Sequence, residues 1–199
     1  MTEPSTPAES PRPADDSSTD PDIDLVRQAQ AGKPGAFSAL FEKYWPRVLP
    51  TAYSWFRNVA EAEDAAIEAV EDAFGSIGRF RGRSRFSTWF FRVVMRRLAY
   101  NKRRSRHKPE ALPLDSCAEV ADPGLSPEER HERSRLIGLL LEAVDSLPEG
   151  LAQAMRLCYF SELDQDEAAQ ALGIRPDALR RRLSLGRQML RRKLRKELA

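Results

Sequence analysis

Arginine and lysine side chains gather in two blocks of the chain, and their chemistry suits the binding of a polyanion. The first block, residues 79–108, contains no acidic residue, and the second block spans residues 180–196. Guanidinium groups hold phosphates and donate paired hydrogen bonds to guanine. A solvated helix face is the alternative explanation for either block alone, but two such blocks in one chain favour two contacts with nucleic acid.

The second basic block lies in a pattern that predicts a helix-turn-helix. Asp164 and Glu167 form a capping pattern at the start of a short helix, and Gly173 can adopt the left-handed conformation that ends it. Pro176 then begins a basic helix whose first turns would enter the major groove. The residues expected to reach base edges or phosphates are Arg175, Asp177, Arg180, Arg181 and Ser184, with Arg187, Arg191 and Arg192 further along as backbone contacts. The alternative is a basic amphipathic helix packed in a bundle.

The first basic block begins with an arginine-rich loop that has an aromatic residue at each end. Glycines interrupt the helical pattern here, so residues 78–84 predict a loop, with Phe80 and Phe86 at its ends. A helix follows over about 85–104, and Ser84 is its expected N-cap.

An acidic stripe lies on the helix predicted for residues 59–77. Its members are Glu61, Asp64, Glu68, Glu71 and Asp72. Like charges three or four residues apart repel by a few tenths of a kcal/mol per pair. A docked basic partner would offset that cost, whereas an ordinary solvated face is the alternative.

The elements that carry these residues are all expected to be helices, because no segment alternates apolar and polar residues with period two. Apolar residues at spacings of three and four predict a short helix from residue 22 and a longer one starting at Pro34. Pro46 and Pro50 are expected to bend or interrupt that longer helix. Ser126 and Glu129 form a capping box that opens the second half of the chain.

We therefore predict an all-α fold of two small helical domains joined by a flexible linker, with the helix-turn-helix in the C-terminal domain. The expected segments are a disordered acidic tail at 1–21, a helical domain at 22–104, a linker at 105–126 and a second helical domain at 127–199. Fully extended, the linker would reach at most ~75 Å. Such a tether would let two domains sit on separate stretches of one DNA molecule.

Composition excludes several function classes. The chain has 199 residues, of which 41% are hydrophobic and 31% charged, and no apolar run is long enough to span a membrane. Only Cys117 and Cys158 are present, without a CxxC motif, which argues against a disulfide framework or a zinc site and fits a cytoplasmic protein. No phosphate-binding loop or nucleophile–base pair is found, so we expect no enzyme activity, no metal and no cofactor.

Two segments together resemble a known family. Residues 62–104 contain the stretch RFRGRSRFSTWFFR, and residues 136–198 contain SLP at 146–148 followed by the helix-turn-helix. In these features the chain resembles bacterial RNA polymerase sigma factors of the sigma-70 family, extracytoplasmic-function type. The resemblance covers about residues 23–104 and 127–198 and implies a transcription initiation factor that binds core RNA polymerase and promoter DNA.

The resemblance also implies roles for individual residues. Docking on the polymerase clamp helices would involve Glu61, Glu63, Asp64, Ile67 and Glu68. The single-stranded promoter −10 element would be held by Arg79, Arg81, Arg83, Arg85, Phe86, Arg92, Arg96, Arg97 and Asn101. Arginine side chains can follow the phosphates, and an aromatic or guanidinium plane can stack on a flipped base. The helix-turn-helix residues named above, with Ala178, would read the −35 element, and a protein anti-sigma factor is a further partner common in this family.

The chain departs from the family pattern at three positions. Ile67 stands where the family usually has Gln, and Arg85 where it has a small polar cap. Ala178 replaces the usual Thr of the recognition helix. These departures affect clamp docking and one −35 contact rather than the class of protein.

Two rival functions remain open from the sequence alone. A helix-turn-helix repressor or activator independent of polymerase would bind duplex DNA tightly as the free protein. The arginine-rich aromatic loop argues against it, because a simple repressor does not need to hold single strands. An enzyme acting on nucleic acid would need convergent metal ligands, and Glu61, Asp64 and Glu68 on one helix face provide few.

Overall fold

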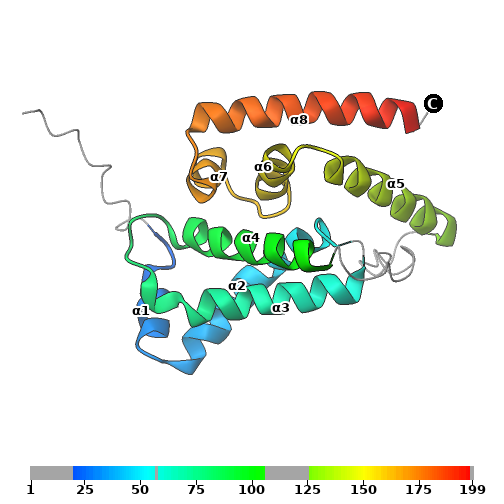
Figure 1. Cartoon of the computed structure of the whole chain (residues 1–199). Coiled ribbons are helices and arrows are strands. Elements are labelled where there is room, and N and C mark those ends of the chain that lie inside the picture. The colour runs from blue at the N-terminus through cyan, green and yellow to red at the C-terminus, as the bar shows by residue number, and fades with distance from the viewer. Residues whose placement is uncertain (1–19, 57, 106–125, 198–199) are drawn as a thin grey trace, which may run out of the picture.

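The computed structural model describes residues 20–56, 58–105 and 126–197, and every regular element in these ranges is helical (Figure 1). The N-terminal unit consists of α1 (Ile23–Gln30), α2 (Pro34–Tyr53), α3 (Val59–Gly75), a 3-10 turn (Ile77–Arg79) and α4 (Phe86–Ser105). The C-terminal unit consists of α5 (Pro127–Asp145), α6 (Glu149–Tyr159), α7 (Gln165–Leu172) and α8 (Pro176–Glu197). The all-α prediction is confirmed for the described residues, whereas most of the predicted tail and linker lies outside them.

The core of the N-terminal unit combines small residues on α3 with aromatic residues on α2 and α4. Four α3 alanines are fully buried, and their short side chains allow neighbouring helices to approach closely: Ala62, Ala66, Ala69 and Ala73. Tyr44 of α2 lies at the centre of the aromatic cluster, with its ring 4.6 Å from Phe90 and 5.6 Å from Phe86. Tilted and edge-on ring pairs of this kind add to the stabilisation that comes from burial.

Helix α2 runs without interruption through both of its internal prolines, so of the two expected effects, a bend or a break, the break does not occur. Pro46 and Pro50 lie four residues apart on the exposed side of the helix, while Tyr44 and Val48 on the opposite side are buried. The carbonyl groups that lose a backbone donor therefore face water, which can replace the missing hydrogen bonds. Burial of the other face then outweighs the local preference to break.

The C-terminal unit is built on the local signals that the sequence predicted. Ser126 and Glu129 form a capping box at the start of α5, and Asp164 and Glu167 form a second one at the start of α7. Each box satisfies backbone N–H groups that have no partner inside the helix. Gly173 ends α7 at φ 66°, and the buried residues Leu179, Leu183 and Leu190 hold α8 against α6 and α7.

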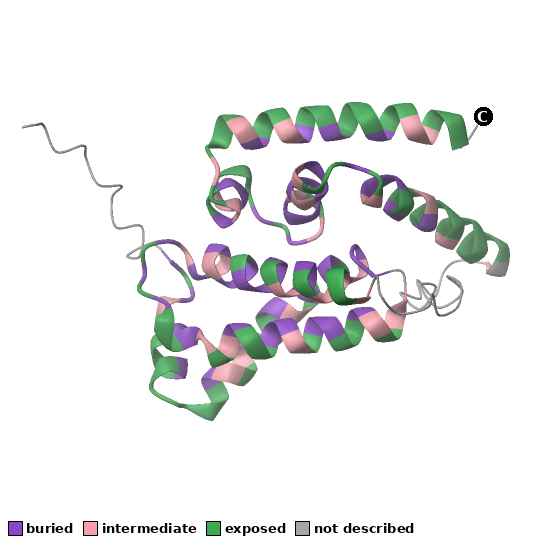
Figure 2. Cartoon of the chain, viewed as in Figure 1, coloured by how far each residue is buried: buried purple, intermediate pink, exposed green. Residues whose placement is uncertain are grey.

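The two units pack against each other in two layers, with α6 and α7 lying between α4 and α8 (Figure 1). Buried residues lie on the facing sides of α4 and α7, whereas the outer side of α8 is exposed (Figure 2). The buried Arg156 of α6 crosses this boundary: its Nε donates to the Ser54 carbonyl at 3.0 Å, and its guanidinium lies 4.2 Å from the Trp55 ring. Burial lowers the pKa of Arg156, and its ion pair with Asp145 opposes that shift.

The left-handed turn at Gly173 leads to a test by substitution. Gly173→Ala should lower the free energy of unfolding by about 1–2 kcal/mol, because nothing crowds the new Cβ and the cost is conformational. Gly35→Ala is the matched control. Gly35 is in the first turn of α2, its φ is not positive and its surroundings are open, so stability should rise by up to ~1 kcal/mol. Denaturant unfolding of both variants measures the difference, and equal effects would contradict the role of the turn.

Candidate nucleic-acid interface

Helices α7 and α8 form the predicted helix-turn-helix. At the N-terminus of α7, the Glu167 N–H donates to Asp164 Oδ1 at 2.8 Å, and the Asp164 N–H donates to Glu167 Oε2 at 3.3 Å. At its C-terminus the Ile174 N–H donates to the Ala169 carbonyl at 3.0 Å, which closes the turn around Gly173. These contacts orient α8 relative to α7, so the first turns of α8 project from the unit.

The residues predicted to read DNA lie on the first turns of α8, with Arg175 in the turn just before it. Six of them are exposed and Ala178 is half-buried; the exposed ones are Arg175, Asp177, Arg180, Arg181, Ser184 and Arg187. Arg180 forms an ion pair with Asp177 one turn earlier, and Arg181 Nε lies 3.5 Å from the Asp177 carbonyl. Arg187 donates to the Tyr159 hydroxyl at 3.2 Å. The surface is therefore cationic and accessible.

The arginine-rich loop lies between the 3-10 turn and α4, and its base is aromatic. The Phe80 and Phe86 rings meet edge-on at 5.5 Å, and Trp89 lies 5.6 Å from each of them. Gly82 has a φ of 69°, which allows the chain to reverse at this point. Arg79, Arg81 and Arg83 are exposed around this base, so the loop presents cations on a rigid support.

Two expectations about this loop are wrong in their details. Phe86, predicted to contact the unpaired strand, is fully buried against Tyr44, Phe80 and Phe90, so it supports the loop from inside. Ser84 is not the N-cap of α4, because the helix begins at Phe86 and the Arg85 carbonyl accepts its first backbone hydrogen bond, from the Trp89 N–H. The first N–H of α4, that of Phe86, instead donates to Asp20 Oδ2 at 2.6 Å.

Asp20 and Gln30 are therefore contacts of the loop that the sequence did not reveal. Gln30 Nε2 donates to the carbonyls of Ile77 and Phe80, at 3.0 and 3.1 Å. Neither residue stands near its partners in the sequence, so no local pattern signals the contact.

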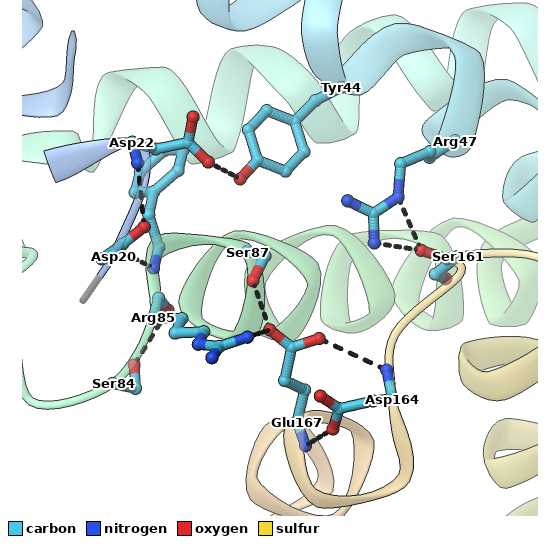
Figure 3. A network of polar contacts seen from close by, with 11 residues as sticks. Asp20, Asp22, Tyr44, Arg47, Ser84, Arg85, Ser87, Ser161, Asp164 and Glu167 are labelled. Atoms are coloured by element: carbon cyan, nitrogen blue, oxygen red, sulfur yellow. Dashed lines mark hydrogen bonds and ion pairs between the residues drawn. The ribbon is translucent and has the colours of Figure 1, made fainter. Parts of the chain in front are cut away.

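Helix α7 covers part of the basic surface formed by the end of the arginine-rich loop and by α4 (Figure 3). The Ser87 hydroxyl donates to Glu167 Oε1 at 2.9 Å, and Arg85 Nη1 lies 3.5 Å from the same oxygen. Arg92 donates to the carbonyls of Gln170 and Ala171 at the other end of α7. These side chains thus contact a carboxylate at the N-terminal end of α7 and backbone carbonyls at its C-terminal end, where the helix dipole is negative.

A second set of contacts between the units involves the α6–α7 connection (Figure 3). Arg47 of α2 donates to the Ser161 carbonyl through Nε at 2.8 Å and Nη2 at 2.6 Å. The Ser161 hydroxyl is buried and lies 3.0 Å from Thr51 Oγ1. In this closed arrangement Arg85 and Arg92 face α7, whereas the first turns of α8 remain exposed.

The acidic stripe on α3 divides into two parts. Its inner part pairs with α4: Glu68 Oε2 accepts from Asn101 at 2.8 Å and from Arg97 at 3.1 Å, and Asp72 pairs with Arg97 at 3.2 Å. The hydrogen bond from Asn101 is the main cause that lowers the pKa of Glu68, with Arg97 adding to it. Arg97 and Asn101, both predicted −10 contacts, thus lie against the acidic stripe, while Arg96 is exposed.

The outer part of the stripe lies toward the N-terminal end of α3, where Glu63 and Ile67 stand beside Glu61 and Asp64. Glu63 and Asp64 are exposed, and Ile67, between them and Glu68, is 47% exposed. Glu61 accepts weakly from the Ser105 hydroxyl at 3.3 Å. The predicted polymerase-binding residues therefore form one surface with an apolar residue among carboxylates.

Within residues 20–56, 58–105 and 126–197, no cluster of three or more His, Cys, Asp or Glu side chains could hold a metal ion. None of the described helices is long and apolar enough to cross a membrane. The one cysteine in these ranges, Cys158, is a free thiol whose pKa is raised by burial.

Two family models match this chain. Residues 40–108 match the model described as Sigma-70 region 2, and residues 137–190 match the model described as Sigma-70, region 4. The first match contains the arginine-rich loop and α4, and the second contains the helix-turn-helix.

Curated relatives extend the similarity over most of the chain. The chain is 28% identical to the RNA polymerase sigma-H factor of Pseudomonas aeruginosa, over 85% of this chain and 91% of that protein. It is 26% identical to the ECF RNA polymerase sigma factor SigW of Bacillus subtilis, over 85% of this chain and 95% of that protein.

Solved structures share the fold. CnrH in complex with the cytosolic domain of CnrY superposes with a TM-score of 0.67 at 20% identity, covering 88% of this chain and 97% of CnrH. The sigma factor RpoE of Bartonella quintana, in complex with the anti-sigma factor NepR, gives a TM-score of 0.60 at 18% identity, covering 80% and 96%. The two-unit helical architecture is therefore shared with both proteins.

The contacts of α4 with α7 predict how the closed arrangement responds to mutation. Arg92→Met removes the donors to the α7 carbonyls, so the separated form should gain population by a factor of roughly ten. Small-angle X-ray scattering of the full chain should report a larger radius of gyration. Arg96→Met, a neighbouring exposed arginine, is the control and should scatter like the wild type. Equal scattering by all three proteins would contradict a role for Arg92 in closure.

Proposed function

The chain belongs to the sigma-70 family, in its extracytoplasmic-function group, and we propose that its two basic surfaces direct core RNA polymerase to promoters. The observation that carries this proposal is the presence, in one chain, of an exposed helix-turn-helix and a separate arginine-rich loop on an aromatic base. The first suits duplex DNA and the second suits an unpaired strand. A duplex-binding repressor would need only the first.

The helix-turn-helix is assigned to the −35 element. The exposed arginines at the start of α8 can donate to guanine edges, while Ser184 and Arg187 suit the phosphate backbone. The Asp177–Arg180 ion pair orients one guanidinium before DNA arrives, which reduces the entropy lost on binding.

The arginine-rich loop and the start of α4 are assigned to the −10 element. Arg79, Arg81 and Arg83 supply exposed cations for the phosphates of the non-template strand. Arg85 and Arg92 lie beside them but contact α7 in the closed arrangement. The two units therefore have to separate before these two arginines reach DNA, and promoter phosphates would replace Glu167 and the α7 carbonyls as their partners.

The outer part of the α3 stripe is assigned to core RNA polymerase. Glu63 and Asp64 supply negative charge, and the exposed Ile67 supplies apolar area that a partner would cover. Apolar positions surrounded by charged ones are typical of protein interfaces. Glu68 has a different role, because it is already paired with Arg97 and Asn101 and stabilises the α3–α4 contact.

Sigma factors are not enzymes, and we propose that this protein likewise has no catalytic activity and acts in the cytoplasm, where RNA polymerase works. An anti-sigma factor is a further proposed partner. Support for it comes from the two structural relatives, of which RpoE was solved with an anti-sigma factor. Such a partner would act by favouring the closed arrangement of the two units.

Reconstitution with core RNA polymerase tests the proposed function directly. The wild-type chain should yield transcripts from specific promoters that core polymerase alone does not produce. Arg180→Ala with Arg181→Ala should reduce transcription from −35-dependent promoters at least about tenfold, since each base-reading arginine contributes ~1–3 kcal/mol. Co-purification with core polymerase should be unchanged. A chain that never co-purifies with core polymerase would favour the rival repressor.

The polymerase-binding surface has its own test. Asp64→Lys reverses an exposed charge on α3, so affinity for core polymerase should fall at least about tenfold if a basic partner docks there. Asp24→Lys makes the same change on exposed α1 and should leave the affinity within about twofold. Fluorescence titration of labelled chain with core polymerase measures both. Equal affinities for the two variants would exclude this face of α3.

A further inference from the structure

The segment that precedes the family match makes the contacts that hold both ends of the arginine-rich loop. The sigma-70 region 2 match begins at residue 40, whereas Asp20, Asp22 and Gln30 lie before it. Asp20 and Asp22 are buried, whereas Gln30 is an exposed residue whose side-chain amide donates to the same unit. Their partners are backbone groups at the two ends of the loop, and side chains of α2.

Asp20 holds the C-terminal end of the loop. Its side chain is only 5% exposed, and its two oxygens accept from different backbone groups: Oδ2 from the Phe86 N–H at 2.6 Å and Oδ1 from the Asp22 N–H at 3.0 Å. The Phe86 N–H is the first of α4 and has no partner within the helix. A carboxylate at this position also interacts favourably with the helix dipole.

Gln30 holds the N-terminal end of the loop. The side-chain amide of this last α1 residue donates to the Ile77 and Phe80 carbonyls, which frame the end of the 3-10 turn. Phe80 and Phe86 are thus each held through their backbone, and their rings contact each other at 5.5 Å. The span of the loop is set by these two anchors together with the aromatic base.

Asp22 holds the anchoring segment itself in place. Asp22 is 3% exposed, and its carboxylate accepts from the Tyr44 hydroxyl at 2.7 Å (Figure 3). The same carboxylate pairs with Lys43 of α2. Burial raises the pKa of Tyr44, and the hydrogen bond to Asp22 adds to this, so Tyr44 remains a donor at neutral pH. The segment is therefore joined to the core that Tyr44 shares with Phe86 and Phe90.

We propose that Asp20 and Gln30 are positioning residues for the unpaired −10 strand. The inference rests on the proposed function, because it assigns the arginine-rich loop to that strand. Arg81 and Arg83 are exposed on either side of Gly82, where the chain reverses. The two anchors fix the ends of the loop and hold the guanidinium groups at one spacing, which lowers the cost of ordering them on DNA.

The test uses full-length chain bound to core polymerase. A promoter is first obtained by transcribing genomic DNA with the wild-type holoenzyme, and its non-template −10 strand is synthesised as a labelled oligonucleotide. Asp20→Ala and Gln30→Ala should each weaken binding of this oligonucleotide at least about tenfold and slow promoter opening, as seen by permanganate reactivity. Binding to core polymerase and to −35 duplex should stay within about twofold, because those surfaces lie elsewhere.

Matched controls and a conservative variant separate positioning from general stability. Asp24→Ala and Gln28→Ala change exposed residues of the same segment and should behave like the wild type. Asp20→Asn keeps one side-chain oxygen that can accept from the Phe86 N–H, so it should recover part of the strand affinity lost in Asp20→Ala.

Two results would overturn the proposal. One is unchanged oligonucleotide binding by both alanine variants. The other is a parallel loss of strand, duplex and core binding, which would make these residues supports of the whole fold. Failure of the wild-type holoenzyme to select any promoter is a different result: it would remove the proposed function and this inference with it.

Discussion

The contact of α4 with α7 determines which basic surfaces this molecule presents. Glu167 caps its own helix and also accepts from Ser87, with Arg85 beside it, while Arg92 interacts with the carbonyl end of the same helix. Helix α7 therefore offers negative charge at one end and carbonyl dipoles at the other, and α4 supplies donors for both. Promoter phosphates would offer these arginines equivalent acceptors, so closure and strand binding would compete for the same groups.

Charged side chains are also paired on the other side of α4, where it contacts α3. Arg97 pairs with Glu68 and Asp72, so the basic helix and the acidic helix neutralise each other where they touch. Charge remains exposed at the outer carboxylates of α3, around the arginine-rich loop and on α8. One acidic surface and two basic surfaces therefore remain exposed. This arrangement would suit a protein that holds a basic partner on one face and DNA on the two others.

Prediction from the sequence succeeded where the physical cause lies within about one helical turn. Both capping boxes, the left-handed Gly173 and the proline starts of α2 and α8 were foreseen, because each depends on residues three or four positions apart. It failed to decide whether Pro46 and Pro50 bend or break α2, since their effect depends on which side of α2 faces water. It failed again at Phe86, because an aromatic residue beside arginines suits a stacking site and a core equally well.

The sequence by itself determined that the described segments are helical, where several of their helices begin or end, and that two basic segments suit DNA, since these properties follow from composition and from neighbours along the chain. Only the tertiary structure decided which of those residues are free to bind. The acceptor for the Phe86 N–H comes from Asp20, and the acceptors for Arg92 come from α7. Residues so distant in sequence come into contact only when the helices pack, and no local sequence pattern predicts these contacts.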